Sequence, residues 1–298
     1  MVELFNRIKE YNYWNGERVH VGLMRTSYLD RIIDSTGNRL IKVLVGQRRV
    51  GKSYLLRQII YTLIEHKGVD PKRIFYFSKE YLAFSAIETA QDLESLYNYY
   101  RKQFDIKGKV YLFLDEIQNV DRWELFVNSC SQDTKNDCEL FITGSNSIML
   151  SGELASRLSG RYVEFEVFSF DFTEYCSMID EPLDKDNFLQ YIQEGGLPET
   201  FHLNSSELKR NYVAALKNTI VLRDIVDRNK IQDIQLLEDI FVFLMTNIGN
   251  LTSISSIVNY FKSKSRKTNY ETVSSYIQYL LNSFISKALI HKILEITA

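Results

Sequence analysis

The amino-acid sequence predicts an α/β fold in which a parallel sheet is covered by helices on both faces and is followed by a helical C-terminal part. Short runs rich in β-branched and aromatic residues alternate with helical or loop stretches, as in parallel sheets. After Phe170 these runs stop, and apolar residues recur at helical spacing through 186–194, 207–228 and 234–248. The predicted strands are residues 40–45, 74–77, 110–114, 140–143 and 162–167.

The first predicted strand leads into a glycine-rich segment that reads Gly46-Gln47-Arg48-Arg49-Val50-Gly51-Lys52-Ser53, and a helical pattern follows from Tyr54. In a G-x-x-x-x-G-K-[ST] segment, the glycines permit backbone conformations in which successive N–H groups surround phosphate oxygens. We expect residues 46–54 to bind a nucleoside triphosphate. Lys52 would reach the β and γ phosphates, and the Ser53 hydroxyl would bind Mg²⁺, next to the positive end of the helix dipole.

Two acidic residues, Asp115 and Glu116, follow the predicted strand at 110–114. A carboxylate in this position can hold Mg²⁺, and the next one can orient or deprotonate the water that attacks the γ-phosphate. We assign Asp115 as a metal ligand beside Ser53 and Glu116 as a catalytic residue. The alternative is that the two acids only mark the solvated end of a core strand.

The following strand ends in Gly144-Ser145-Asn146, which places small polar side chains level with the two acids if the strands are neighbours. Asn146 is the first candidate for a residue that senses the γ-phosphate, and Ser145 is the second, because an amide can both donate and accept a hydrogen bond. A plain turn built on Gly-Ser-Asn is the competing interpretation.

Two arginines further along, Arg157 and Arg161, are candidates for stabilising the charge that develops during phosphoryl transfer. In ring-forming ATPases such an arginine acts across a subunit interface, so this hypothesis includes a homo-oligomer with the arginine in trans. A surface ion pair is the alternative for each of them.

The C-terminal segment has apolar positions at helical spacing in 254–261 and 272–281, followed by an apolar, strand-like end. This pattern resembles a helix-turn-helix with the start of a wing, and it fits a truncated form of a longer architecture because the sequence stops at Ala298. The basic residues between the two helices are candidates for contacts with DNA phosphates, although a solvated loop explains the same charges. They are Lys262, Lys264, Arg266 and Lys267.

Composition limits the functional classes. Hydrophobic residues make up 45% of the 298 residues, so a sizeable core is expected. Residues 1–200 contain 24 Lys and Arg against 30 Asp and Glu, whereas residues 201–298 contain 12 against 8, so a nucleic-acid partner would meet the C-terminal part. The three cysteines form no C-x-x-C pair, and no membrane span or signal-peptide core is visible. We expect a cytoplasmic protein without a membrane partner.

The guanine-recognition motif Asn-Lys-x-Asp has no match. The nearest segment, Thr134-Lys135-Asn136-Asp137, lacks the leading asparagine, so ATP is the expected nucleotide.

The series of motifs resembles the prokaryotic AAA-type ATPases usually paired with a DUF4143 domain. The resemblance rests on the glycine-rich segment, L-D-E-I-Q-N-V-x-x-W-E, I-T-G-S-N-S, L-x-S-R-L-S-G-R-Y and Gly195-Gly196-Leu197-Pro198, and it covers roughly residues 25–290. It implies that 46–53 is the Walker A loop, that Asp115 and Glu116 are Walker B, and that Ser145 or Asn146 is sensor 1. It also implies that Arg161 or Arg157 is the arginine finger and that the Gly-Gly-Leu-Pro segment lies in a lid beside the nucleotide.

The expected architecture is therefore an N-terminal segment (1–38), an AAA+-like P-loop NTPase core (39–170), a helical lid (171–235) and a winged-helix-like region (236–298). The leading hypothesis is ATP hydrolysis that depends on Mg²⁺ and is coupled to DNA binding through the C-terminal helices. The alternative is a STAND-like signalling ATPase in which nucleotide acts as a latch and the C-terminal region binds a protein partner.

Overall fold

The computed structural model describes residues 2–16, 20–144, 156–247, 250 and 252–283. The chain folds as two compact units, Met1–His202 and Leu203–Ala298. The finer boundaries expected after residues 38, 170 and 235 stay predictions. In the described part of the chain, no helix is long and apolar enough to cross a membrane.

The first unit is built on a five-stranded sheet with the strand order β2-β3-β4-β1-β5 and parallel pairing throughout. This confirms the predicted α/β class and all five predicted strands. Because the strands are parallel, the segments that follow β1, β3 and β4 lie side by side at the carboxyl ends of the strands. The strands are β1 (Ile41–Val45), β2 (Ile74–Ser78), β3 (Val110–Asp115), β4 (Cys138–Gly144) and β5 (Tyr162–Glu166).

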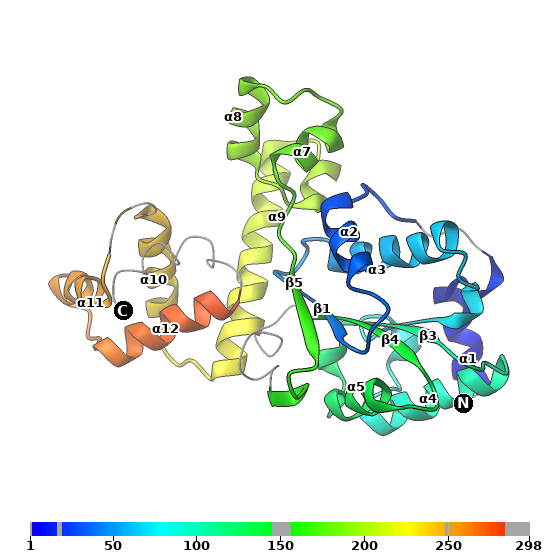
Figure 1. The fold of residues 1–298 in the computed structure, drawn as a ribbon. Coiled ribbons are helices and arrows are strands. Elements are labelled where there is room, and N and C mark those ends of the chain that lie inside the picture. The colour runs from blue at the N-terminus through cyan, green and yellow to red at the C-terminus, as the bar shows by residue number, and fades with distance from the viewer. Residues whose placement is uncertain (1, 17–19, 145–155, 248–249, 251, 284–298) are drawn as a thin grey trace. The chain divides into compact units, whose positions relative to one another are not determined.

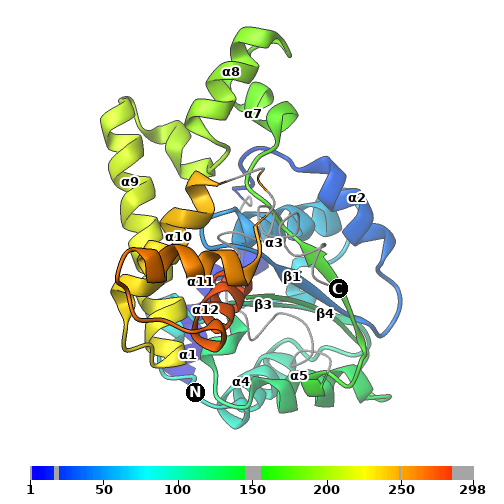
Figure 2. The same cartoon turned by 90° about the vertical axis from the view of Figure 1, so that its left-hand side faces the viewer.

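Helices cover both faces of this sheet (Figures 1 and 2). On one face lie α2 (Thr26–Asp34) and α3 (Lys52–Tyr61), the latter continuing as a π-helical turn (Thr62–His66), and on the other lie α4 (Ala90–Gln103) and α5 (Trp123–Gln132). The buried face of α3 packs against sheet residues that include Phe113 and Phe141, whose rings stack with centroids 4.7 Å apart. This packing fixes the helix that follows the glycine-rich loop.

The N-terminal segment packs at the β2 edge of the sheet. It consists of α1 (Val2–Ile8) and the 3₁₀ helices Lys9–Tyr11 and Tyr13–Asn15. The Asn12 amide donates to the Tyr76 carbonyl (3.0 Å) and accepts from the Tyr76 N–H (2.7 Å), which satisfies backbone groups of the edge strand. The connections before and after β2 contain the 3₁₀ helices Pro71–Arg73 and Leu82–Phe84, and a further 3₁₀ helix, Ile117–Asn119, follows β3.

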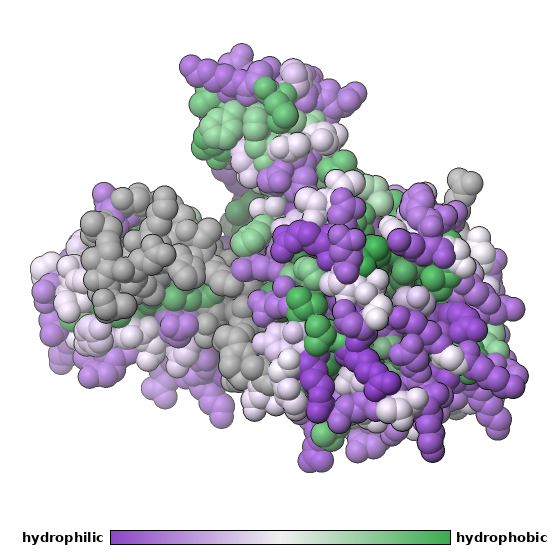
Figure 3. Space-filling view, in the orientation of Figure 1, coloured by the Kyte–Doolittle hydropathy of each residue, from purple (hydrophilic) through white to green (hydrophobic). Residues whose placement is uncertain are grey.

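Two helices, α7 (Phe172–Ile179) and α8 (Lys185–Glu194), and the 3₁₀ helix Pro198–His202 complete the first unit. Gly196 is required where this segment approaches Phe170, because a Cβ on it would lie 2.0 Å from the Phe170 carbonyl oxygen. Hydrophobic side chains gather on the surface around α8, as Figure 3 shows. They are Leu183, Phe188, Leu189 and Ile192.

The second unit is helical. It contains α9 (Ser206–Thr219), which continues as a π-helical stretch (Ile220–Asp227), and α10 (Ile234–Thr246), α11 (Ile254–Ser263) and α12 (Tyr270–Asn282). These helices share a buried core that includes Ile240, Ile257 and Val273. The two short C-terminal helices are present as predicted, whereas the expected wing lies outside the described residues.

Candidate functional site

The loop after β1 has the backbone that the two glycines were expected to allow. Gly46 takes a φ of 149° and Gly51 a φ of 95°, and Gly51 precedes the first turn of α3. A Cβ at Gly46 would also lie 2.2 Å from the Val167 carbonyl oxygen. Glycine is therefore required at both positions, and the positive end of α3 opens toward the loop.

Lys52 points back into this loop. Its ammonium donates to the carbonyl oxygens of Gly46 and Gln47, each at 2.9 Å, and lies 3.9 Å from Glu116 Oε1. Burial lowers the pKa of Lys52, and the neighbouring carboxylates of Glu116 and Asp115 oppose this shift. The loop thus holds a buried cation that can exchange carbonyl oxygens for phosphate oxygens.

Asp115 is almost completely buried at the end of β3. Its carboxylate accepts hydrogen bonds from the hydroxyls of Tyr76 (2.9 Å) and Thr143 (2.5 Å), and from that of Ser53. Burial raises the pKa of Asp115 despite these hydrogen bonds. A carboxylate beside a serine hydroxyl fits Mg²⁺, which prefers hard oxygen ligands and keeps several waters.

The backbone of Glu116 adopts the left-handed conformation, with φ 51° and ψ 44°, which is unfavourable for residues that carry a side chain. Its N–H donates to Thr143 Oγ1 (2.9 Å), and its carboxylate accepts a hydrogen bond from the Gln118 amide. Thr143 therefore contacts both acids. Neither Thr143 nor Gln118 was predicted as a site residue, although both lie within the motifs I-T-G-S-N-S and L-D-E-I-Q-N-V.

The two candidate arginines lie away from this group. Arg157 forms an ion pair with Glu124 (3.3 Å) in the same chain. Arg161 is exposed and directly precedes β5. The first residue of β5, Tyr162, pairs with Ile41 at the start of β1. Arg161 therefore lies at the end of the sheet opposite to the loop, about 16 Å away along a five-residue strand. Ser145 and Asn146 lie outside the described residues.

A cavity of about 360 Å³ opens beside the loop. Its walls come from residues 20–25, from Gly51, Tyr54 and Gln58, and from the segment that ends in Pro198–His202. Gln58 fixes the first wall, because its amide donates to the carbonyls of Val21 (2.8 Å) and Leu23 (2.6 Å). The volume lies within the range of small-molecule sites, about 300–1,000 Å³. No motif in residues 20–25 indicates this wall.

Arg25 joins the loop to α7. Its buried guanidinium forms two hydrogen bonds with the Glu174 carboxylate (2.7 and 2.8 Å) and donates to the carbonyls of Val50 (3.2 Å) and Phe168 (2.9 Å). A bidentate pair of this kind fixes orientation as well as distance. No sequence pattern indicates this residue, because its partners are distant in the chain.

Two family models match the chain. Residues 38–176 match a family described as an AAA domain, and residues 185–291 match a domain of unknown function, DUF8612. The expected pairing with DUF4143 is therefore not confirmed, since a different family matches the C-terminal part.

Among curated proteins, an uncharacterized protein of Haemophilus influenzae is 33% identical over 268 residues, which cover 88% of this chain and 65% of that protein. An uncharacterized protein of Methanocaldococcus jannaschii is 30% identical over 257 residues, which cover 82% and 55%, respectively. The chain thus spans less than two thirds of the length of these relatives.

The chain is also similar to several solved structures. Aeropyrum pernix ORC1 in complex with DNA is 17% identical, with 88% of this chain and 84% of that chain covered and a TM-score of 0.44. AMPPCP-bound DnaA from Aquifex aeolicus is 15% identical, with 95% of this chain and 98% of that chain covered and a TM-score of 0.40. Thermotoga maritima RuvB is 17% identical, with 86% of this chain and 84% of that chain covered and a TM-score of 0.39. The strand order and the glycine-rich loop, rather than these distant similarities, define the α/β fold of the first unit. Residues 38–176 are thus similar to an AAA domain, and they contain the parallel sheet and the glycine-rich loop described above.

Proposed function

We propose that this protein binds ATP with Mg²⁺ at Gly46–Ser53 and hydrolyses it. The observation that supports this most is the convergence of Lys52, Ser53, Asp115 and Glu116 at one edge of the sheet, with the two charged ends of Lys52 and Glu116 3.9 Å apart. A buried cation, a metal-ligand pair and a second carboxylate are the groups that phosphoryl transfer to water requires.

Each residue has a separate task in this proposal. Backbone N–H groups of the loop and Lys52 bind the phosphates, while Ser53 and Asp115 hold Mg²⁺, which when bound neutralises charge on the β and γ oxygens. Glu116 orients the attacking water and accepts its proton. Asn146 would sense the γ-phosphate, and an arginine from a neighbouring copy would stabilise the developing charge.

The cavity beside Gly51 is the proposed place for the base and sugar. It lies between the N-terminal wall and the Pro198–His202 segment, so a bound nucleotide would connect the loop to the lid. The missing guanine motif supports ATP as the preferred nucleotide.

Phosphate release from ATP and GTP, measured with Mg²⁺ and with EDTA, tests the proposal. We expect ATP hydrolysis that requires Mg²⁺, exceeds GTP hydrolysis and is lost in Lys52→Ala together with nucleotide binding. Equal turnover in wild type and Lys52→Ala would contradict the assignment of the loop.

For the C-terminal unit we propose DNA binding through the turn between α11 and α12. Lys262 at the end of α11 and Lys264 and Lys267 in the turn are exposed, whereas Arg266 pairs with Asp233 (2.9 Å) and Asp239 (3.6 Å). Three phosphate contacts would give a slope of log K against log salt of about −3. A protein-binding signalling switch is the second candidate, favoured by the lack of any Lys or Arg in α12.

A titration of duplex DNA over a range of salt concentrations separates the two candidates. DNA binding predicts this slope and its decrease by about one for each lysine replaced by glutamine. Absence of binding at low salt, or binding unaffected when all three lysines are replaced, would contradict the DNA proposal and leave the protein partner.

A further inference from the structure

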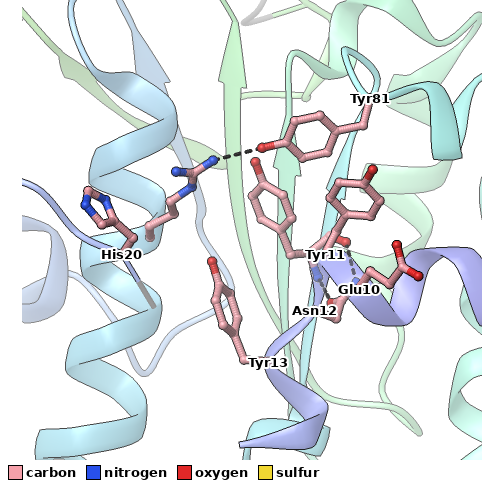
Figure 4. Close-up of a pocket in the computed structure, with 8 residues that line it drawn as sticks. Glu10, Tyr11, Asn12, Tyr13, His20 and Tyr81 are labelled. Atoms are coloured by element: carbon pink, nitrogen blue, oxygen red, sulfur yellow. Dashed lines mark hydrogen bonds between the residues drawn. The ribbon is translucent and has the colours of Figure 1, made fainter. Parts of the chain in front are cut away.

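A second cavity, of about 220 Å³, lies at the β2 edge of the first unit and shares the lining residue His20 with the proposed base cavity. Figure 4 shows it between the N-terminal segment, α3 and the segment after β2. Its volume is below the range of about 300–1,000 Å³ typical of drug-sized ligands, so it suits a molecule smaller than a nucleotide. It is lined by Glu10, Tyr11, Asn12, Tyr13, His20, Arg57, Tyr76 and Tyr81.

The cavity contains a cation, the guanidinium of Arg57. Arg57 is half-buried, donates to the Tyr81 hydroxyl (2.8 Å) and lies over the Tyr54 ring (4.9 Å). Within the described ranges, no carboxylate lies within 4 Å of its guanidinium, so its charge is balanced there only by the Tyr81 hydroxyl, the Tyr54 ring and solvent. Glu10, the only carboxylate among the described lining residues, is exposed and lies across the close-up from His20 (Figure 4).

The tyrosines around Arg57 add further donors. Burial raises the pKa of Tyr13 to about 12, so its hydroxyl keeps its proton at neutral pH. The hydroxyls of Tyr13 and Tyr81 point into the cavity (Figure 4), and neither donates to an acceptor in the described part of the chain. Donors therefore exceed acceptors, which favours a ligand rich in acceptor oxygens.

This cavity is connected to the proposed metal site by one side chain. Tyr76 lines it, and the Tyr76 hydroxyl donates to Asp115 Oδ2 (2.9 Å). A ligand that competes for this hydroxyl changes the hydrogen bonding of the carboxylate assigned to Mg²⁺.

We propose that the cavity around Arg57 is a regulatory site for a small anion bearing a carboxylate or phosphate group, and that Tyr76 transmits its occupancy to Asp115. The anion supplies a counter-charge for Arg57 and accepts hydrogen bonds from Tyr13 and Tyr81. The binding part is independent of catalysis, whereas the regulatory part rests on the ATP hydrolysis proposed above.

Calorimetric titration of the full chain tests binding, with inorganic phosphate and malonate as probes for the two anion classes. Lys52→Ala serves as the background, because it removes phosphate binding at Gly46–Ser53. We expect one site in this background, a loss of at least about tenfold in affinity on adding Arg57→Gln, and a loss of about two- to tenfold on adding Tyr13→Phe, which removes a single hydroxyl.

Two results would overturn the site. One is that neither anion binds the Lys52→Ala background at concentrations up to about 10 mM, since a charge-paired site should exceed that weak affinity. The other is anion binding that persists in Arg57→Gln and disappears in Lys52→Ala, which would assign it to the loop. The conservative Tyr13→Phe variant keeps the test valid if the Arg57 variant does not fold.

The regulatory part is tested by ATP turnover against Mg²⁺ concentration. The anion should shift the half-maximal Mg²⁺ concentration by about fivefold in wild type and leave it unchanged in Tyr76→Phe, which still binds the anion. An equal shift in Tyr76→Phe would overturn the role of Tyr76. If wild type hydrolyses no ATP, the proposed function fails, while the binding result stands by itself.

Discussion

Asp115 illustrates how single residues at this site balance function against stability. Its carboxylate is buried among three hydroxyls and has no cation bonded to it among the described residues. Such a group suits a metal ligand better than a structural one, because the ionised form is costly until a cation arrives. The same logic applies to Lys52, a buried ammonium that donates hydrogen bonds to carbonyls of its own loop.

This balance predicts that Asp115→Asn stabilises the nucleotide-free protein at neutral pH. Because burial raises the pKa of Asp115 above 3.8, the ionised form costs folding free energy once the pH exceeds the raised value. An amide of the same shape removes that cost, so the melting temperature should rise by about 2–4 °C for each kcal/mol gained. Thermal melts from about pH 4 to pH 8 should show a difference that vanishes at the acidic end.

A variant that melts below wild type at neutral pH, or a difference that is constant with pH, would contradict this account. Thr143→Val is an informative comparison, since it removes a hydroxyl that supports the carboxylate and leaves the carboxylate in place. It should lower stability at neutral pH.

At the residue scale, the sequence predicted the loop and the two acids because each belongs to a short local motif. It missed Thr143, Gln118 and Arg25 because their roles depend on which strands and helices become neighbours. The structure brings Lys52, Ser53, Asp115 and Glu116 together, and their catalytic roles stay predictions. Arg157 is paired with Glu124, a contact that no spacing rule could have shown.

At the scale of elements, the strands could be predicted to within about two residues because apolar β-rich runs bounded by polar segments are a strong local signal. The order β2-β3-β4-β1-β5 could not be predicted in the same way, since periodicity does not say which strands pair. The wall at residues 20–25 was missed for a similar reason. This wall precedes the loop in the sequence, whereas Gln58, which holds it by hydrogen bonds, follows the loop.

The link between the loop and α7 gives a prediction at this scale. Arg25→Met and Glu174→Gln should each lower the stability of the first unit. A double-mutant cycle should give a coupling energy of about 1–3 kcal/mol, because Arg25 is buried, Glu174 is partly buried and the pair is bidentate. Chemical denaturation of the four proteins measures it. Arg7 and Glu3, an exposed pair, provide a control cycle with a coupling below about 1 kcal/mol. Equal coupling in the two cycles would contradict a specific role for Arg25.

At the scale of the whole molecule, the position of Arg161 determines how it can act. It lies at the opposite end of the sheet from its own loop, so a role in hydrolysis would require the loop of a neighbouring copy. Mixing Lys52→Ala with Arg161→Ala should therefore restore ATP turnover to a measurable fraction of wild type, since some interfaces combine an intact loop with an intact arginine. The Arg157→Ala variant is the control. It should lose little ATPase activity by itself, because Arg157 pairs with Glu124 of its own chain. Absence of rescue over a range of protein concentrations would argue against action in trans.

The central claim is that Glu116 activates water for hydrolysis of ATP bound at Gly46–Ser53. Its most direct test is single-turnover hydrolysis in Glu116→Gln, with ATP affinity measured on the same protein. We predict an affinity close to that of wild type and a hydrolysis rate lower by about 10²- to 10⁴-fold, because the amide cannot accept a proton. Wild-type hydrolysis by Glu116→Gln, or loss of ATP binding in that variant, would contradict the account.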